Sequence, residues 1–390
     1  MMGSEWHRKT WGELATLEYG KGLRGYQEAT GNFRVYGTNG PIGWHDKPLC
    51  PFPSVVVGRK GAYRGIHFSS KPFYVIDTAF YLNPVADFDI KWAYYELLTH
   101  DINSMDSGSA IPSTSRESFY RLPVWVPPLS EQRAIAHILG TLDDKIELNR
   151  QMNETLEAIA QAIFKSWFVD FDPVHAKADG RDPGLPKEIA DLFPDSFENS
   201  ELGKIPKGWK LNKLGDVIAL AYGKALKASN RMPGNVPVYG SNGPVGLHNE
   251  ALVKGPGIIV GRKGNPGMIT WSSRDFYPID TTFYVVPKTS LSSLFYLFYA
   301  LKAQDLPSLS ADSAVPGLNR NLAYMNQILV PLHKVLTSFD KHVSPLFERI
   351  DANEKESITL STLRDTLLPK LLSGKFRVPD TEKLLMEAGL

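Results

Sequence analysis

The chain has 390 residues, of which 43% are hydrophobic and 22% are charged, and its formal net charge at pH 7 is +1. This length is enough for two or three domains that each bury a core. The single cysteine, Cys50, excludes an internal disulfide and a cysteine-rich zinc site. The first residues form no apolar leader, and the longest apolar run (294–301) is too short to span a bilayer, which favours a cytoplasmic protein.

The chain contains two copies of one module, separated by 203 residues. Between 36–83 and 239–286, 24 of 48 positions are identical without a gap. The shared stretches include "YGTNGPIG" and "YGSNGPVG", "VVVGRKG" and "IIVGRKG", and "FYVIDTAFY" and "FYPIDTTFY". A repeat of this period indicates a duplicated domain, because solenoid units usually span 20–50 residues.

Each module is predicted to be mixed α and β. The runs "SVVVG" and "GIIVG" are β-branched and end in glycine, as strands do. The Asn-Gly pairs at 39–40 and 242–243 predict hairpin turns. Residues 90–100 and 291–301 are expected to form helices.

A long helix is predicted after each module, at 130–171 and at 333–376. Apolar and central polar residues recur there at spacings of four and three, which is typical of a helix-against-helix seam. The seam residues are Ile135, Leu139, Leu142, Ile146, Asn149, Asn153, Leu156, Ile163 and Trp167 in the first helix, and Phe339, Val343, Leu346, Ile350, Asn353, Ser357, Leu360, Leu367 and Leu371 in the second. Antiparallel pairing would place Asn153 opposite Asn353 and Trp167 opposite Phe339. Arg364 interrupts the second seam, and Pro345 and Pro369 leave the straightness of that helix in doubt.

The sequence contains no signature of catalysis. It lacks a phosphate-binding loop, an Asn/Asp-Pro-Pro-aromatic tetrapeptide, an H-E-x-x-H motif and a G-x-S-x-G motif. We therefore predict no catalytic residue and no metal site. His45 and His248 recur between the modules, but one histidine per module is more often a hydrogen-bonded turn residue than a catalyst.

Cations in glycine-flanked turns are the main candidates for binding a partner. Arg59, Lys60, Arg262 and Lys263 stand in the two Gly-Arg-Lys-Gly turns, where cations suit phosphate oxygens or guanine. Positions that differ between the modules are candidate base readers: Arg64, Ser113, Thr114 and Asn319. The remaining candidate DNA-binding residues are Lys21, Arg24, Tyr36, Asn39, Arg116, Lys224, Lys227, Tyr239, Asn242 and Arg320. For the two Tyr and two Asn residues among them, we favour a role in shaping the hairpin turns.

These stretches, together with "PPLSEQRAIAHILGTLDDKIELNRQMNETLEAIAQAIFKSWF" and "LPKLLSGKFRV", resemble the specificity subunit of type I restriction–modification enzymes over nearly the whole chain. The resemblance implies an α+β protein in which two homologous target-recognition domains are separated by an antiparallel two-helix coiled coil with pseudo-two-fold symmetry. Each domain would read one half of a split, asymmetric DNA site. The expected boundaries are 1–129 and 208–332 for the two domains, 130–171 and 333–376 for the helices, 172–207 for a linker and 377–390 for a tail.

The resemblance also implies partners and places the cofactors in them. Two modification subunits would methylate adenine with S-adenosylmethionine, and a restriction subunit would use ATP and Mg²⁺, so that this chain carries no cofactor. Three alternatives remain open: the specificity chain of a type IIB-like enzyme, a DNA-bridging scaffold without enzyme partners, and a glycan-binding scaffold.

Overall fold

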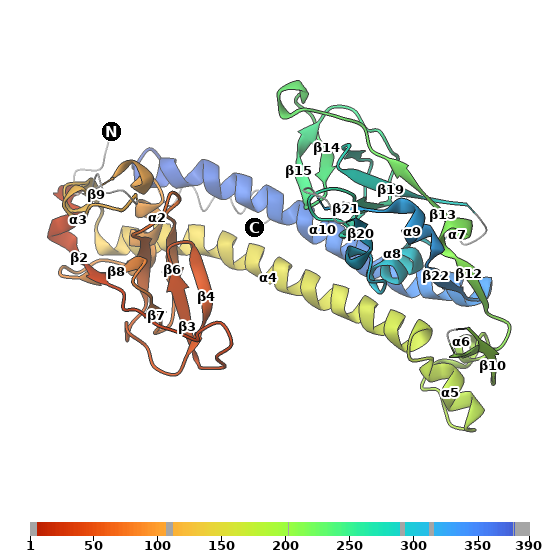
Figure 1. The fold of residues 1–390 in the computed structure, drawn as a ribbon. Helices are drawn as coiled ribbons and strands as arrows, with labels where there is room; N and C mark the ends of the chain where they lie inside the picture. The colour runs from red at the N-terminus through yellow and green to blue at the C-terminus, as the bar shows by residue number, and fades with distance from the viewer. Residues whose placement is uncertain are drawn as a thin grey trace. The chain divides into compact units, whose positions relative to one another are not determined.

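The computed structural model describes residues 6–106, 112–201, 203–288, 293–311, 316–376 and 378. Residue contacts divide the chain into two compact units, one of residues 1–148 with 356–390 and the other of residues 149–355. Each unit contains one module and one part of each long helix (Figure 1). The predicted tail lies outside the described residues, apart from residue 378.

The first module contains three small sheets. Its elements are β1 (His7–Thr10), α1 (Trp11–Leu14), β2 (Ala15–Tyr19), β3 (Phe33–Gly37), β4 (Gly40–His45), β5 (Ser54–Gly58), β6 (Ile66–Ser69), β7 (Tyr74–Val75), β8 (Ala79–Pro84), α2 (Ile90–Leu97), the 3-10 turn η1 (Ile102–Ser104), α3 (Arg116–Tyr120) and β9 (Pro123–Val126). The strand orders are β2-β8-β5-β6, β4-β3-β7 and β1-β9. Strand β5 is buried along its whole length, because Val55 and Val57 pack into one hydrophobic cluster and Val56 packs into another.

The second module repeats this topology. Its elements are β12 (Lys210–Lys213), α7 (Leu214–Val217), β13 (Ile218–Tyr222), the 3-10 turn η2 (Ala228–Asn230), β14 (Val236–Gly240), β15 (Gly243–His248), β16 (Gly257–Gly261), β17 (Ile269–Ser272), β18 (Tyr277–Pro278), β19 (Thr282–Pro287), α8 (Leu294–Lys302), the 3-10 turn η3 (Pro307–Leu309), β20 (Ser310–Ala311), β21 (Gly317–Leu318), α9 (Arg320–Met325) and β22 (Gln327–Val330). The orders β13-β19-β16-β17, β15-β14-β18 and β12-β22 match the first module strand for strand. The predicted duplication of a mixed module is confirmed.

The Asn-Gly pairs form the tips of two hairpins. Strand β3 ends at Gly37, which pairs with Gly40, so that only Thr38 and Asn39 form the loop. The β14–β15 hairpin has the same register. Gly40 has a φ of +108° and Gly243 a φ of +98°, values that favour glycine. The predicted turns are therefore confirmed.

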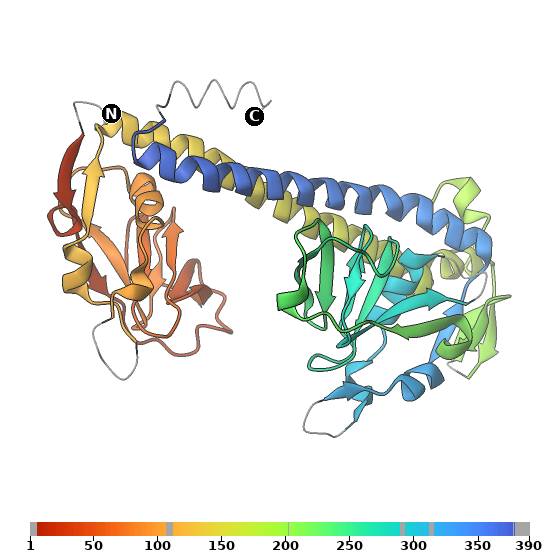
Figure 2. The same cartoon turned by 90° about the horizontal axis from the view of Figure 1, so that it is seen from above.

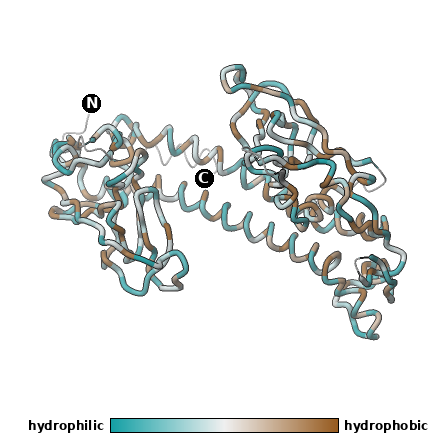
Figure 3. The backbone as a smooth tube through the Cα atoms, viewed as in Figure 1, coloured by the Kyte–Doolittle hydropathy of each residue, from teal (hydrophilic) through white to brown (hydrophobic). Residues whose placement is uncertain are grey.

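The long helices α4 (Leu129–Phe168) and α10 (His333–Leu372) run antiparallel in each unit (Figure 2). In the first unit, Ile135, Leu139 and Leu142 share a buried cluster with Leu360, Leu367 and Leu371. Hydrophobic and hydrophilic residues alternate along both helices (Figure 3), which gives each helix one face for its partner. Helix α10 continues through Pro345 and Pro369 without a break.

The second unit confirms the predicted pairing register. Asn353 Nδ2 donates to Asn153 Oδ1 at 2.8 Å, and the rings of Trp167 and Phe339 lie 6.1 Å apart. Asn149, which is fully buried, donates to the Asn353 carbonyl at 3.4 Å. Every predicted seam residue is buried or partly buried. Polar contacts at these positions favour one register over its neighbours.

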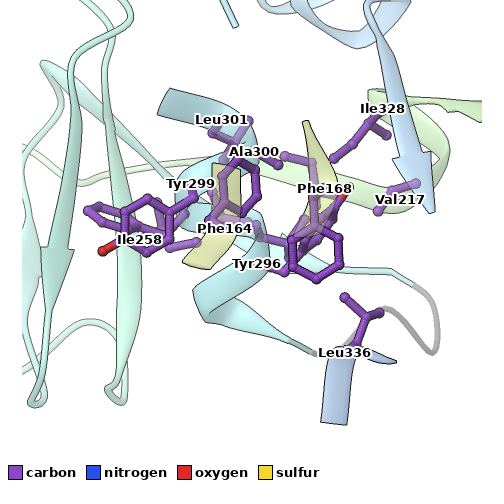
Figure 4. Close-up of a cluster of buried hydrophobic side chains, with 14 of the residues drawn as sticks. Phe164, Phe168, Val217, Ile258, Tyr296, Tyr299, Ala300, Leu301, Ile328 and Leu336 are labelled. Carbon is purple, nitrogen blue, oxygen red and sulfur yellow. The ribbon is translucent and has the colours of Figure 1, made fainter. Parts of the chain in front are cut away.

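Aromatic residues fasten the helices to the second module. Phe164 and Phe168 of α4 point into a cluster with Tyr296 and Tyr299 of α8 (Figure 4). The ring centroids of Phe168 and Tyr296 lie 4.9 Å apart, and those of Phe164 and Tyr299 lie 5.5 Å apart. Contacts of this kind stabilise a core beyond the burial of area.

The segment 172–207 has structure of its own and is more than the predicted linker. It contains α5 (Asp172–Ala178), α6 (Lys187–Ala190) and the hairpin β10 (Phe197–Ser200) with β11 (Gly203–Pro206). Phe193 packs on Trp167, and Lys177 Nζ donates to the carbonyl oxygens of Ala190 and Phe193. The segment therefore extends the core of the second unit around the end of α4.

Candidate nucleic-acid interface

The two Gly-Arg-Lys-Gly turns have the same backbone geometry. Arg59 and Lys60 both donate their backbone N–H groups to the Thr78 carbonyl, at 2.9 and 3.1 Å. Arg262 and Lys263 donate to the Thr281 carbonyl at the same two distances. Each turn directly follows a buried central strand, β5 or β16, so the end of that strand sets the position of the Arg-Lys pair.

The first arginine of each turn lies over an exposed tyrosine. Arg59 Cζ is 4.7 Å from the centre of the Tyr19 ring, and Arg262 Cζ is 4.8 Å from that of Tyr222. Arg59 also donates to the Asp77 carbonyl at 3.0 Å, and Arg262 donates to the Asp280 carbonyl at 2.9 Å. The tyrosines are the last residues of β2 and β13 and are 48% and 49% exposed.

A second arginine completes each group. Arg116, the first residue of α3, has its Cζ 5.1 Å from the Tyr19 ring centre. Arg320, the first residue of α9, has its Cζ 4.8 Å from the Tyr222 ring centre. We call these groups the Arg–Tyr–Arg clusters: Arg59, Tyr19 and Arg116 in the first module, and Arg262, Tyr222 and Arg320 in the second.

The clusters are strongly cationic. Arg116 donates to the Tyr120 hydroxyl from Nε at 3.2 Å and from Nη2 at 2.9 Å, and these hydrogen bonds raise the pKa of its guanidinium. Among the described residues, no carboxylate forms an ion pair with any of the four arginines. Lys60 differs, because its Nζ lies 3.2 Å from Asp77 Oδ2. Two half-buried arginines beside an exposed tyrosine make each cluster a suitable environment for an anion.

Five further predicted cations lie on exposed loops. Lys21 and Arg24 are exposed between β2 and β3, and Lys224 and Lys227 are exposed between β13 and β14. Lys263 is exposed as well. These loops differ in sequence between the modules and start beside the Arg–Tyr–Arg clusters.

Two predicted base readers are buried, and the structure corrects that prediction. Arg64 is 2% exposed, and its Nη2 donates to the Asn103 carbonyl at 2.7 Å. Thr114 is 4% exposed, and its hydroxyl donates to the Gly58 carbonyl at 2.7 Å. Neither side chain is free to contact a base in this structure, since each one holds neighbouring loops together.

The other candidates have mixed positions. Asn319 is exposed and caps α9 by accepting from the N–H groups of Asn321 and Leu322, whereas Ser113 is half-buried. Tyr239 is 8% exposed and packs edge-on against Phe276, so it supports the hairpin and is not a surface contact. The half-buried Tyr36 packs in the same way on Phe73, while Asn39 and Asn242 are exposed at the hairpin tips.

Tyr19 and Tyr222 were not predicted as site residues. A signal was present, because "YGKGL" (19–23) and "YGKAL" (222–226) align at the module offset. The candidates from these stretches were the lysines alone. What could not be read from the sequence is that the tyrosine lies beside two arginines that are about 40 and 97 residues away along the first module.

The family model for the type I restriction modification DNA specificity domain matches residues 3–158 and 206–332. The chain belongs to this family. The two matched ranges cover the two modules and about three quarters of α4. Both copies of the Arg–Tyr–Arg cluster lie within the matched ranges.

Curated relatives agree with this membership, and a solved structure shares the fold. The chain is 29% identical over 332 residues to the type I restriction enzyme HindI specificity subunit of Haemophilus influenzae, which covers 68% of this chain and 71% of that protein. It is 26% identical over 330 residues to the MjaIX specificity subunit of Methanocaldococcus jannaschii, with 74% and 70% covered. The crystal structure of the type I restriction–modification S subunit from M. genitalium has the same fold, with a TM-score of 0.61, 21% identity, and 94% and 96% covered.

No group of three or more His, Cys, Asp or Glu side chains in the described ranges is placed to hold a metal ion. No helix there is long and apolar enough to cross a membrane.

Proposed function

We propose that this type I specificity chain binds double-stranded DNA and reads a split, asymmetric site, one half with each module. The observation that carries the proposal is the repetition of one cationic cluster, with half-buried arginines around an exposed tyrosine, in two modules whose surrounding loops differ. DNA offers the same phosphates everywhere and different base edges at each half-site. The shared cluster is suited to bind the phosphates, and the divergent loops are suited to read the base edges.

The divergent loops are the proposed source of base specificity. They are residues 24–34 against 227–237, 62–65 against 265–268, and 113–116 against 317–320. Exposed side chains on these loops, such as Arg24 in the first module and Lys227 and Asn319 in the second, remain the candidates for base contacts.

We propose further that the chain is non-catalytic and serves as a scaffold. Two modification subunits would bind it and methylate adenine with S-adenosylmethionine, and a restriction subunit would act with ATP and Mg²⁺. The paired helices α4 and α10 are the proposed docking surface, since the Arg–Tyr–Arg clusters belong to the modules.

Sequencing of methylated adenines in the host genome tests this function. With the chain present, we expect methylation at one motif made of two short specified parts and an unspecified spacer. Deletion of the chain should abolish methylation at that motif, and complementation should restore it. An unchanged methylation pattern after deletion would contradict the proposal and favour a DNA-bridging or glycan-binding scaffold.

A further inference from the structure

We propose that each Arg–Tyr–Arg cluster is a phosphate clamp, which holds one phosphodiester of duplex DNA and contributes no base specificity. The inference rests on the proposed DNA-binding function and assigns a ligand and a role to six residues. The tyrosine acts as a positioning residue, and the two guanidinium groups make the contact.

Each cluster brings together three segments that are far apart in the sequence. In each module the tyrosine ends one strand, the first arginine follows another strand, and the second arginine begins a short helix. The four distances from guanidinium to ring centre lie between 4.7 and 5.1 Å. Because the modules have diverged at half of the positions compared, an arrangement kept this closely is expected to serve a need that both share.

In the described part of the chain, the cluster arginines have an uncompensated charge and unused hydrogen-bond donors. An aromatic ring holds a guanidinium in place without neutralising its charge. Each guanidinium has five N–H donors, and Arg59 gives one of its donors to the Asp77 carbonyl. Within the described ranges, the cluster arginines bond only to carbonyl and hydroxyl oxygens, so that their positive charges are uncompensated. A phosphate supplies both the negative charge and the acceptor oxygens.

The clusters are better suited to bind a phosphate than to read a base. The two modules are expected to read different sequences, and a base-reading group would therefore differ between them. The ring faces of Tyr19 and Tyr222 that carry guanidinium groups are also not available for stacking on a base. The same phosphate contact in both modules needs neither a different residue nor an open ring face.

The test measures binding of the full chain to duplexes of random sequence over a series of salt concentrations. Arg59→Ala with Arg116→Ala removes the first clamp, and Arg262→Ala with Arg320→Ala removes the second. The slope of log K against log salt is negative, and each pair of changes should make it less steep by about 0.9. All four changes together should make it less steep by about twice that value. Affinity should fall by the same factor for every duplex, whatever its sequence.

A matched control removes the same charge elsewhere. Lys204 and Lys207 are exposed cations on the 172–207 segment that pair with no described carboxylate, and Lys204→Ala with Lys207→Ala should leave the slope unchanged. An equal fall in the control would overturn the clamp in favour of a general charge effect. Arg59→Lys with Arg116→Lys keeps the charge but loses the fork and the stacking. This second variant should bind several-fold more weakly, and wild-type affinity would also overturn the clamp.

The outcomes separate the clamp from the function on which it rests. A wild-type chain whose DNA binding does not depend on salt would contradict the proposed function itself. A steep wild-type slope that is unchanged in the cluster variants would overturn the clamp alone. A loss of affinity confined to some sequences would show that the arginines read bases.

Discussion

Tyr95 of α2 and Tyr299 of α8 are equivalent residues of the two modules, but their hydroxyl groups have different surroundings. The Tyr95 hydroxyl donates to Asp143 Oδ2 at 2.6 Å, and Asp143 also pairs with Arg364 at 2.6 Å. At the equivalent position beside Tyr299 stands Phe347 in place of Asp143. The buried Tyr299 hydroxyl has no hydrogen-bond partner among the described residues. Arg364, which interrupted the apolar seam in the sequence, is thus explained by an ion pair.

This difference predicts opposite outcomes for one substitution at two sites. Tyr95→Phe should lower the free energy of unfolding by about 1.5–3 kcal/mol, because it removes a hydrogen bond to a charged group. Tyr299→Phe should be neutral or stabilising, because it removes a buried polar group without a partner. Chemical denaturation of the full-length variants measures both values. Equal losses at the two sites would show that the hydrogen bond from Tyr95 to Asp143 contributes nothing.

Residue roles were only partly predictable from the sequence. Identity between the modules was sufficient to select Arg59 and Arg262, because shared cations at glycine turns remain visible after divergence. Divergence selected Arg64 for base reading, but Arg64 is buried, and Gly267 at the equivalent position lets the loop approach Pro307 closely. A position can thus differ because the local packing differs, and sequence comparison alone does not distinguish this cause from a change in ligand.

At the scale of elements, the helices were the most predictable part. A seam of many residues predicts that the helix packs against a second helix with a matching seam. The pairing of Asn153 with Asn353 then follows from the antiparallel register alone. The 172–207 segment was less predictable, since it has no second copy to compare and its helices have only 7 and 4 residues. Its structure depends on contacts with residues outside it, such as the packing of Phe193 on Trp167.

The length of α4 and α10 predicts the spacing of the two half-sites. Each helix has 40 residues, or about 60 Å at 1.5 Å per residue. One heptad inserted after residue 148 and another after residue 355 preserves every seam pair inside each unit. The insertion adds about 10 Å, on the order of three base pairs. Methylome sequencing should show a longer unspecified spacer between unchanged half-sites, whereas an unchanged spacer would contradict a role for the helices as a ruler.

At the scale of the whole molecule, the proposed function requires that each module reads its half-site independently of the other module. Each module has its own sheets, its own buried core and its own Arg–Tyr–Arg cluster. Changes in one module should therefore affect the other little, because the free energies of distant, separate sites nearly add. Asymmetry of the DNA site would follow from the divergence of the loops.

Exchange of one module tests this claim most directly. Residues 1–129 are replaced by the equivalent module of another type I specificity chain, and methylated adenines are sequenced in a host that expresses the hybrid with its modification subunits. We predict that one half of the methylated motif changes, while the other half and the spacer stay as they are in the wild type. A hybrid that alters both halves, or that methylates the original motif, would contradict the reading of one half-site by each module.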